Sequence, residues 1–342
     1  MPPAASDSTG RLPRLAPALL LVVLAPIVAE FLLADFTVRN LAVLLVLLPL
    51  YGCGALLVRE VTRRSGRGWP TMLLLGLAFA LIEEAFLTQS LFNPDYAHKR
   101  LLDYGYLPAI GTSLNWALFV LSIHVVWSIA TPILIAEGLA GERRTAPWLQ
   151  RIGVTVTAGF FLLGCTAITA VSLNASPFVA SATQFAVAAT MVAATLVTAF
   201  VAFARVDARP LPPSPTASPS IAIVGVATLV LATAYLAVER YAPGRGVGPA
   251  VSLVLGLTCE AVALLLLSRW AQRRGWTPRH YLAIAAGTTL TYFLFGLSVV
   301  TSGHTNLGAP TTVVDVAGHV GLGVAAFALI AWAAQQSPRA AT

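Results

Sequence analysis

The sequence contains little charge. Asp, Glu, Lys and Arg make up 10% of its 342 residues, whereas hydrophobic residues make up 57% and the mean hydropathy is +0.81. Soluble domains average about 25% charged residues, so this composition excludes a soluble globular domain and indicates a polytopic helical membrane protein. Lysine is nearly absent, with Lys99 the one lysine among 21 basic residues. This arginine bias, with many alanines, is typical of a GC-rich bacterial genome.

Cysteine is also scarce. Cys53, Cys165 and Cys259 lie far apart inside apolar runs and form no CxxC pair, which argues against a disulfide framework or a thiolate metal site. The chain has no P-loop, GxSxG, zinc-protease helix or dinucleotide-binding motif. ATPases, serine hydrolases of that type and dinucleotide enzymes are therefore disfavoured.

Long apolar runs dominate the sequence instead. The first follows Arg11 and Arg14 and is too long for a signal-peptide core, so we expect an uncleaved span rather than a cleavable signal. Apolar composition predicts an all-α protein with ten membrane spans. The expected spans are 15–34, 41–58, 69–91, 115–138, 152–172, 181–204, 220–238, 248–268, 281–302 and 313–335.

The basic residues predict the orientation. Sixteen of them fall in connections that would share one side with the N-terminus, and five fall on the other. Because cytoplasmic segments are enriched in Lys and Arg, both termini are predicted to be cytoplasmic in a bacterial inner membrane. The net charge of +7 is then explained by topology signals and lipid headgroup contacts, and no nucleic-acid partner is expected.

A proline-rich stretch divides the chain. We expect a cytoplasmic tail at 1–14, a six-span bundle at 15–204, a linker at 205–219 without capacity to pack, a four-span bundle at 220–335 and a tail at 336–342. Trp69-Pro70 follows span two much as Trp276-Thr-Pro278 follows span eight. This echo suggests a parallel repeat of spans 1–4 in spans 7–10, although short cytoplasmic turns of any such protein could read alike.

Two adjacent acids, Glu83 and Glu84, lie inside the third apolar run. Burying an ionisable group at such a depth costs at least about 2.5 kcal/mol, so paired acids there indicate function more than packing. An α-helix turns about 100° per residue, which predicts that one acid faces inward and the other only supports it.

Two histidines fall at a similar depth. Glu83 lies roughly 12 Å below the outer boundary, His124 roughly 13 Å and His319 roughly 9 Å, so the three groups are predicted to meet. Packing histidines are the alternative explanation, since interhelical hydrogen bonds are common in membrane proteins. Four further polar residues lie in or near the spans and are secondary candidates: Asp315, Asn115, Glu30 and Glu260.

The segment Glu83-Glu84-Ala-Phe-Leu-Thr88 resembles the Glu-Glu-x-x-x-Arg motif of the CAAX protease/bacteriocin-processing (CPBP) superfamily of intramembrane proteases. The family has Phe-x-x-x-His and His-x-x-x-Asn motifs on later helices. Here Thr88 replaces the arginine, Phe119 precedes His124 by five positions, and Gly323 follows His319 where asparagine is expected. The chain also resembles uncharacterised bacterial polytopic membrane proteins.

The resemblance implies an intramembrane protease of the glutamate or metallo type. Glu83, Glu84, His124 and His319 would be catalytic, with the histidines able to hold a water or a divalent metal such as zinc, and the substrate would be a membrane-embedded peptide. Residues alone leave two alternatives open. One is a proton-coupled transporter with Glu260 as the coupling acid. The other is a non-catalytic membrane scaffold.

Overall fold

The computed structural model describes residues 15–203 and 214–337, and the fold over these ranges is all-α as predicted. Nine of its helical stretches are long and apolar enough to cross a membrane, while the first, Ala16–Phe31, is shorter. The helices are α1 (Ala16–Pro26), η1 (Ile27–Phe31), η2 (Val38–Val43), α2 (Leu44–Leu47), η3 (Leu48–Gly52), α3 (Cys53–Arg64), α4 (Trp69–Ile82), η4 (Glu83–Leu87), η5 (Tyr96–His98), α5 (Leu114–Ile123), η6 (His124–Ala130), α6 (Thr131–Ala140), η7 (Gly141–Thr145), α7 (Arg151–Ala175), α8 (Ala182–Val201), α9 (Ile221–Tyr241), η9 (Pro243–Arg245), α10 (Pro249–Ala271), α11 (Pro278–Thr301) and α12 (Val313–Gln336).

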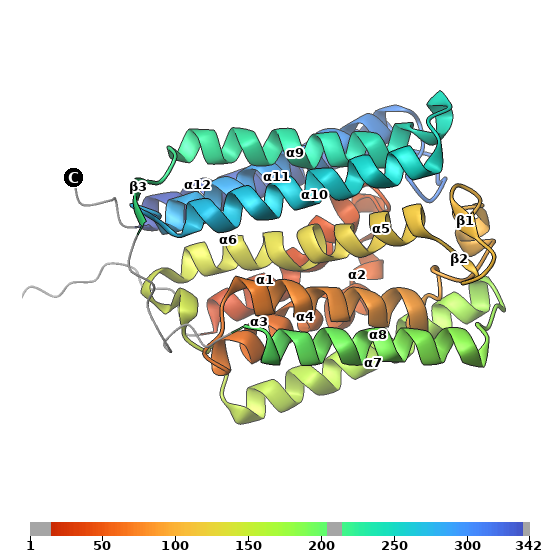
Figure 1. Cartoon of the computed structure of the whole chain (residues 1–342), viewed down its shortest axis with the longest axis horizontal. Helices are drawn as coiled ribbons and strands as arrows, with labels where there is room; N and C mark the ends of the chain where they lie inside the picture. The colour runs from red at the N-terminus through yellow and green to blue at the C-terminus, as the bar shows by residue number, and fades with distance from the viewer. Residues whose placement is uncertain (1–14, 204–213, 338–342) are drawn as a thin grey trace, which may run out of the picture.

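The long helices run roughly parallel to one another. Figure 1 shows α9, α10, α11 and α12 along one side of the bundle and α7 and α8 along the other, with α5 and α6 between them. In the most apolar window of each stretch, 67% of residues are buried for Leu114–Thr145 but only 11% for α7, α8 and α10. The helix built from α5, η6 and α6 is therefore central, and α7, α8 and α10 present most of their surface to lipid.

Short strands connect helix ends. The β1 (Tyr106–Leu107) and β2 (Thr112–Ser113) strands form an antiparallel hairpin in the loop after η4, and β3 (Ser214–Ala217) pairs in parallel with β4 (Arg273–Arg274). The last part of the stretch expected to be a linker, at 205–219, therefore includes a short strand. The rest of that linker, the tail expected at 1–14, and residues 338–342 of the tail expected at 336–342 lie outside the described ranges.

Arg59 of α3 is fully buried and connects three segments: α3, α6 and the chain before α7. Arg59 donates to Glu137 (Nε–Oε1, 3.1 Å) and to Glu60, and its guanidinium lies 3.5 Å from the centre of the Trp148 ring. Arg63 reaches the second Glu137 oxygen at 2.6 Å. From the sequence, arginines at helix ends are expected to act as topology signals and to contact lipid headgroups. Arg59 instead belongs to a buried ion-pair network.

Close helix contacts depend on glycine at some positions. A Cβ added at Gly164 of α7 would lie 2.5 Å from the Leu50 nitrogen and 2.7 Å from the Pro49 carbonyl carbon, whereas one at Gly159 would have no neighbour within 4 Å. We expect Gly164→Ala to cost about 1–3 kcal/mol, because backbone atoms cannot move aside as a flexible side chain can. Gly159→Ala should be neutral or stabilising by up to about 1 kcal/mol through helix propensity.

Thermal unfolding of the two purified variants in one detergent compares them directly. A Gly164→Ala protein as stable as Gly159→Ala would show that α7 is not closely packed against η3.

Candidate functional site

Two glutamates from one helix and a histidine from the next meet in the interior. His124 Nε2 lies 2.7 Å from Glu84 Oε1, and His124 Nδ1 lies 3.6 Å from Glu83 Oε2. All three residues are at most 5% exposed. The predicted approach of Glu83 to His124 is therefore present in the structure, and Glu84 joins them.

The two acids have different surroundings. Glu84 Oε2 accepts hydrogen bonds from the hydroxyls of Thr88 (3.0 Å) and Ser90, and Trp116 Nε1 donates to Ser90 at 3.2 Å. Glu83 Oε2 is buried and has no hydrogen-bond partner among the described residues. Glu84 is thus held in place by neighbours, while Glu83 keeps an oxygen available for a proton, a water or a cation.

The histidine is fixed by its ring as well as by its nitrogens. Its ring stacks on Tyr51 at a centroid distance of 5.8 Å, and the Phe79 ring meets it edge-on at 6.3 Å. Ser128 Oγ lies 3.0 Å from Nδ1. Since both nitrogens and both flanks are engaged, the imidazole has little freedom to rotate.

A third glutamate extends this group. Glu30 interacts with the Tyr51 side chain and with Asp35, and Tyr51 also interacts with Glu83. Tyr51 therefore bridges Glu30 to the central acids. Sequence analysis did not identify Tyr51 as a site residue, and its only signal was a phenol hydroxyl placed within an apolar run.

Each helix that supplies these residues is π-helical where it does so. The four π-helical segments of the described chain are η1, η3, η4 and η6, which carry Glu30, Tyr51, the adjacent glutamates and His124. The backbone nitrogen of Thr88, for example, bonds to the Glu83 carbonyl five residues earlier at 2.9 Å. Single π turns occur often at functional sites because they change the direction of side chains.

The π turn explains a failed expectation. An ideal α-helix separates neighbours by about 100°, which predicted that only one acid would face the site. The wider turn from Glu83 to Leu87 reduces that angle, and both carboxylates reach His124.

His319 does not join the group. Its Nε2 is 3.0 Å from the Phe293 carbonyl and its ring stacks on Phe293 at 5.4 Å, so the histidine is engaged by α11. Of the three groups predicted to meet, His319 is therefore absent from the site, and among described residues the metal-ligand atoms that cluster within 4.8 Å belong to Glu83, Glu84 and His124.

The secondary candidates have partners of their own. Asp315 receives two bonds from Arg39 Nε (2.8 and 2.9 Å) and caps α12. Asn115 donates to the Pro249 carbonyl at 3.1 Å. Glu260 accepts from Ser122. Of the four, Glu30 is the one that the structure places beside the central acids.

The loop after η4 approaches the site from one end of the bundle. Burial, and then the charges of the site carboxylates, raise the pKa of Tyr96 well above its usual value. Burial and the neighbouring Glu30 carboxylate raise the pKa of Asp35. Both groups are therefore neutral over a wider pH range than usual, which reduces repulsion around the buried acids.

The donor set fits a divalent cation. Carboxylate oxygens and imidazole nitrogens are both ligands that zinc uses, and one such atom from each of Glu83, Glu84 and His124 lies within 4.8 Å of the other two. The same groups could instead hold a water molecule and exchange protons with it.

A sequence profile of an uncharacterized membrane protein family matches residues 19–341 of the chain. No curated protein and no solved structure matches the chain. The profile match supports the membrane class expected from composition, and the resemblance to intramembrane proteases rests on the motif residues alone.

Proposed function

Because the chain belongs to this uncharacterized membrane protein family, a function has to be argued from the site, and we propose an intramembrane hydrolase of the bacterial cytoplasmic membrane. The observation that carries the proposal is that buried His124 lies 2.7 Å from Glu84 and 3.6 Å from Glu83. The substrate class is a membrane-embedded or juxtamembrane peptide that approaches beneath the outer loop.

The different surroundings of the two acids assign them different roles. Glu83, whose Oε2 accepts no hydrogen bond from the described residues, takes a proton from water as the water oxygen attacks the peptide carbonyl carbon. Glu84, held by Thr88 and Ser90, orients His124, which stabilises the negative charge on the carbonyl oxygen. When the C–N bond breaks, the proton on Glu83 passes to the leaving amine nitrogen.

A divalent cation such as zinc fits the same three side chains. When bound, it would supply Lewis-acid activation of water. Glu83, Glu84 and His124 would hold it, and the hydroxyls that bond to Glu84 would keep that carboxylate in position.

A proton-coupled carrier is the second candidate. It is favoured by the succession of acids Asp35, Glu30 and Glu83, which leads from the outer end of the bundle to the site through Tyr51. Glu260, the coupling acid expected from the sequence, lies apart from this succession and accepts a hydrogen bond from Ser122.

The test uses the full-length protein in liposomes with membrane proteins extracted from cells that lack it, and new peptide termini are counted by mass spectrometry. We expect wild type and Glu260→Gln to generate the same termini and Glu83→Gln to generate none, because an amide cannot take the proton from water. Full cleavage by Glu83→Gln would refute the hydrolase. Proton uptake driven by a pH gradient and abolished in Glu30→Gln would establish the carrier, because Glu30 lies in the middle of this succession of acids.

A further inference from the structure

A groove with a charged mouth lies between α9, α11 and α12, away from the glutamate site. Its floor is formed by apolar side chains of the three helices, among them Leu282, Ala286 and Ile330. Its mouth is formed by Arg279, Gln335 and Ser337. Helices α9 and α11 begin at this end of the groove, and α12 ends there.

Among the described residues, Arg279 at the mouth forms no ion pair with a carboxylate. Arg279 Nε is buried without a hydrogen-bond partner among the described residues, and Nη2 makes one long bond of 3.4 Å to the Ser337 carbonyl. The chain segments that form this end, 214–225, 273–286 and 330–337, contain no Asp or Glu. Leaving a buried guanidinium nitrogen unpaired is costly, so an anion is the partner that this end lacks.

The helix directions favour an anion as well. The N-termini of α9 and α11, which begin at Ile221 and Pro278, carry partial positive charge. Guanidinium groups bind phosphate through paired N–H donors. An apolar floor that continues from such a mouth has the chemistry of one lipid molecule, with a phosphate at one end and an acyl chain at the other.

We propose that this groove binds one anionic phospholipid, with its phosphate at Arg279 and an acyl chain along Leu282, Ala286 and Ile330. The arginine-rich end of the bundle is the expected cytoplasmic side, and cytoplasmic leaflets are rich in anionic lipids. This binding site is independent of the hydrolase proposal, because none of its residues contacts the glutamate group.

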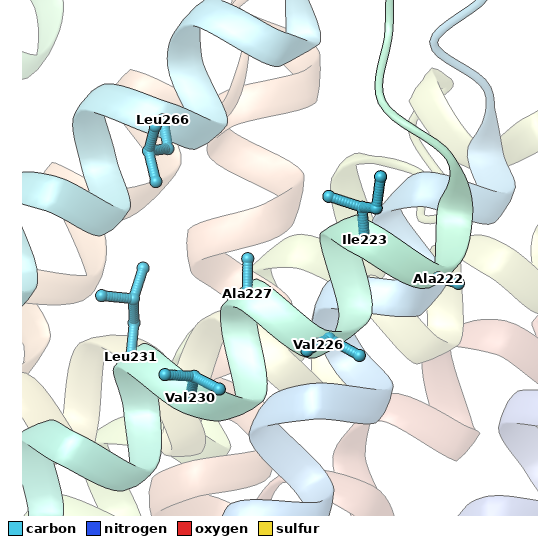
Figure 2. Close-up of a pocket in the computed structure, with 7 residues that line it drawn as sticks. All are labelled: Ala222, Ile223, Val226, Ala227, Val230, Leu231 and Leu266. Carbon is cyan, nitrogen blue, oxygen red and sulfur yellow. The ribbon is translucent and has the colours of Figure 1, made fainter.

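A second groove supplies a natural control. Figure 2 shows the groove between α9 and α10, which is lined by aliphatic side chains such as Ile223, Val226, Ala227 and Leu266 and has no charged group. It offers an acyl chain the same kind of surface without an anchor for the phosphate. Lipids should therefore exchange there without headgroup preference.

The test measures retained lipid by native mass spectrometry after the full-length protein is exchanged between phosphatidylglycerol and phosphatidylcholine micelles. Wild type should retain one phosphatidylglycerol at least about tenfold more strongly than phosphatidylcholine, since one charge-assisted hydrogen bond accounts for such a factor. Arg279→Gln should lose the preference and Ala286→Phe should lose the bound lipid. Ala227→Phe, in the uncharged groove, should behave as wild type.

Four results would overturn the proposal. The first is equal retention of both lipids by wild type, and the second is an unchanged preference in Arg279→Gln. The third is lipid binding that requires deletion of residues 338–342, which would identify the tail of the chain as the occupant. The fourth is displacement of bound phosphatidylglycerol by inorganic phosphate added at the same concentration as the phospholipid. That result would identify a free anion as the ligand instead of a lipid.

Discussion

Replacing Arg59 by alanine is expected to lower the free energy of unfolding by about 3–5 kcal/mol. The guanidinium compensates two buried carboxylates, Glu60 and Glu137, and covers the Trp148 ring. It also donates to two backbone carbonyls, at 144 and 146, which fasten the segment after α6. Alanine would leave both acids with one positive partner fewer in a region that water does not reach.

Arg151→Ala is the matched control, because Arg151 is exposed at the start of α7. Exposed substitutions usually change stability by less than about 0.5 kcal/mol. Unfolding in mixed micelles, followed by tryptophan fluorescence, compares the two. Equal unfolding midpoints for both variants would mean that the buried ion-pair network does not stabilise the fold.

His124→Ala is expected to reduce peptide cleavage by about 10²–10⁴-fold, the usual contribution of one acid–base group. His319→Gln should retain most activity, because His319 bonds to the Phe293 carbonyl and an amide nitrogen can replace that bond. The measurement is the initial rate on the peptide identified with the reconstituted wild-type protein.

Comparison of the two histidines also tests the sequence-based hypothesis. If His319→Gln were as inactive as His124→Ala while remaining folded by circular dichroism, the catalytic group would include His319 and the site would have to close around it. If neither variant lost activity, the hydrolase assignment would fail.

The all-α fold and the core of the site could be predicted because both depend on one-dimensional properties. Apolar length determines where spans begin and end, and depth along a span determines which polar groups can meet. Glu83 and His124 were matched by depth alone, and they lie in contact. Helices that follow one another in the chain are usually neighbours in space, which favoured this pairing.

Depth along a span does not predict contacts between spans that are not adjacent in the chain. His319 has a suitable depth, but α12 packs against α11, and the nearest acceptor for its ring is the Phe293 carbonyl. Tyr51 and Glu30 reach the site from the first two spans, and nothing in their sequence context specifies that approach. Arg59 was misjudged for a related reason, since position near a helix end does not reveal whether a segment folds over it.

The four π-helical turns link the length of the helices to the chemistry at their centre. Each turn contains one residue more than α-helical bonding requires, so deleting one residue would restore regular bonding and rotate the rest of the helix by about 100°. Such a deletion could make the helix more regular and yet turn Glu83 or His124 away from its partners. Deletion of one residue at a π-helical turn would therefore disrupt the site in the same step. A sequence that evolved toward regular α-helices would lose whatever function the site has.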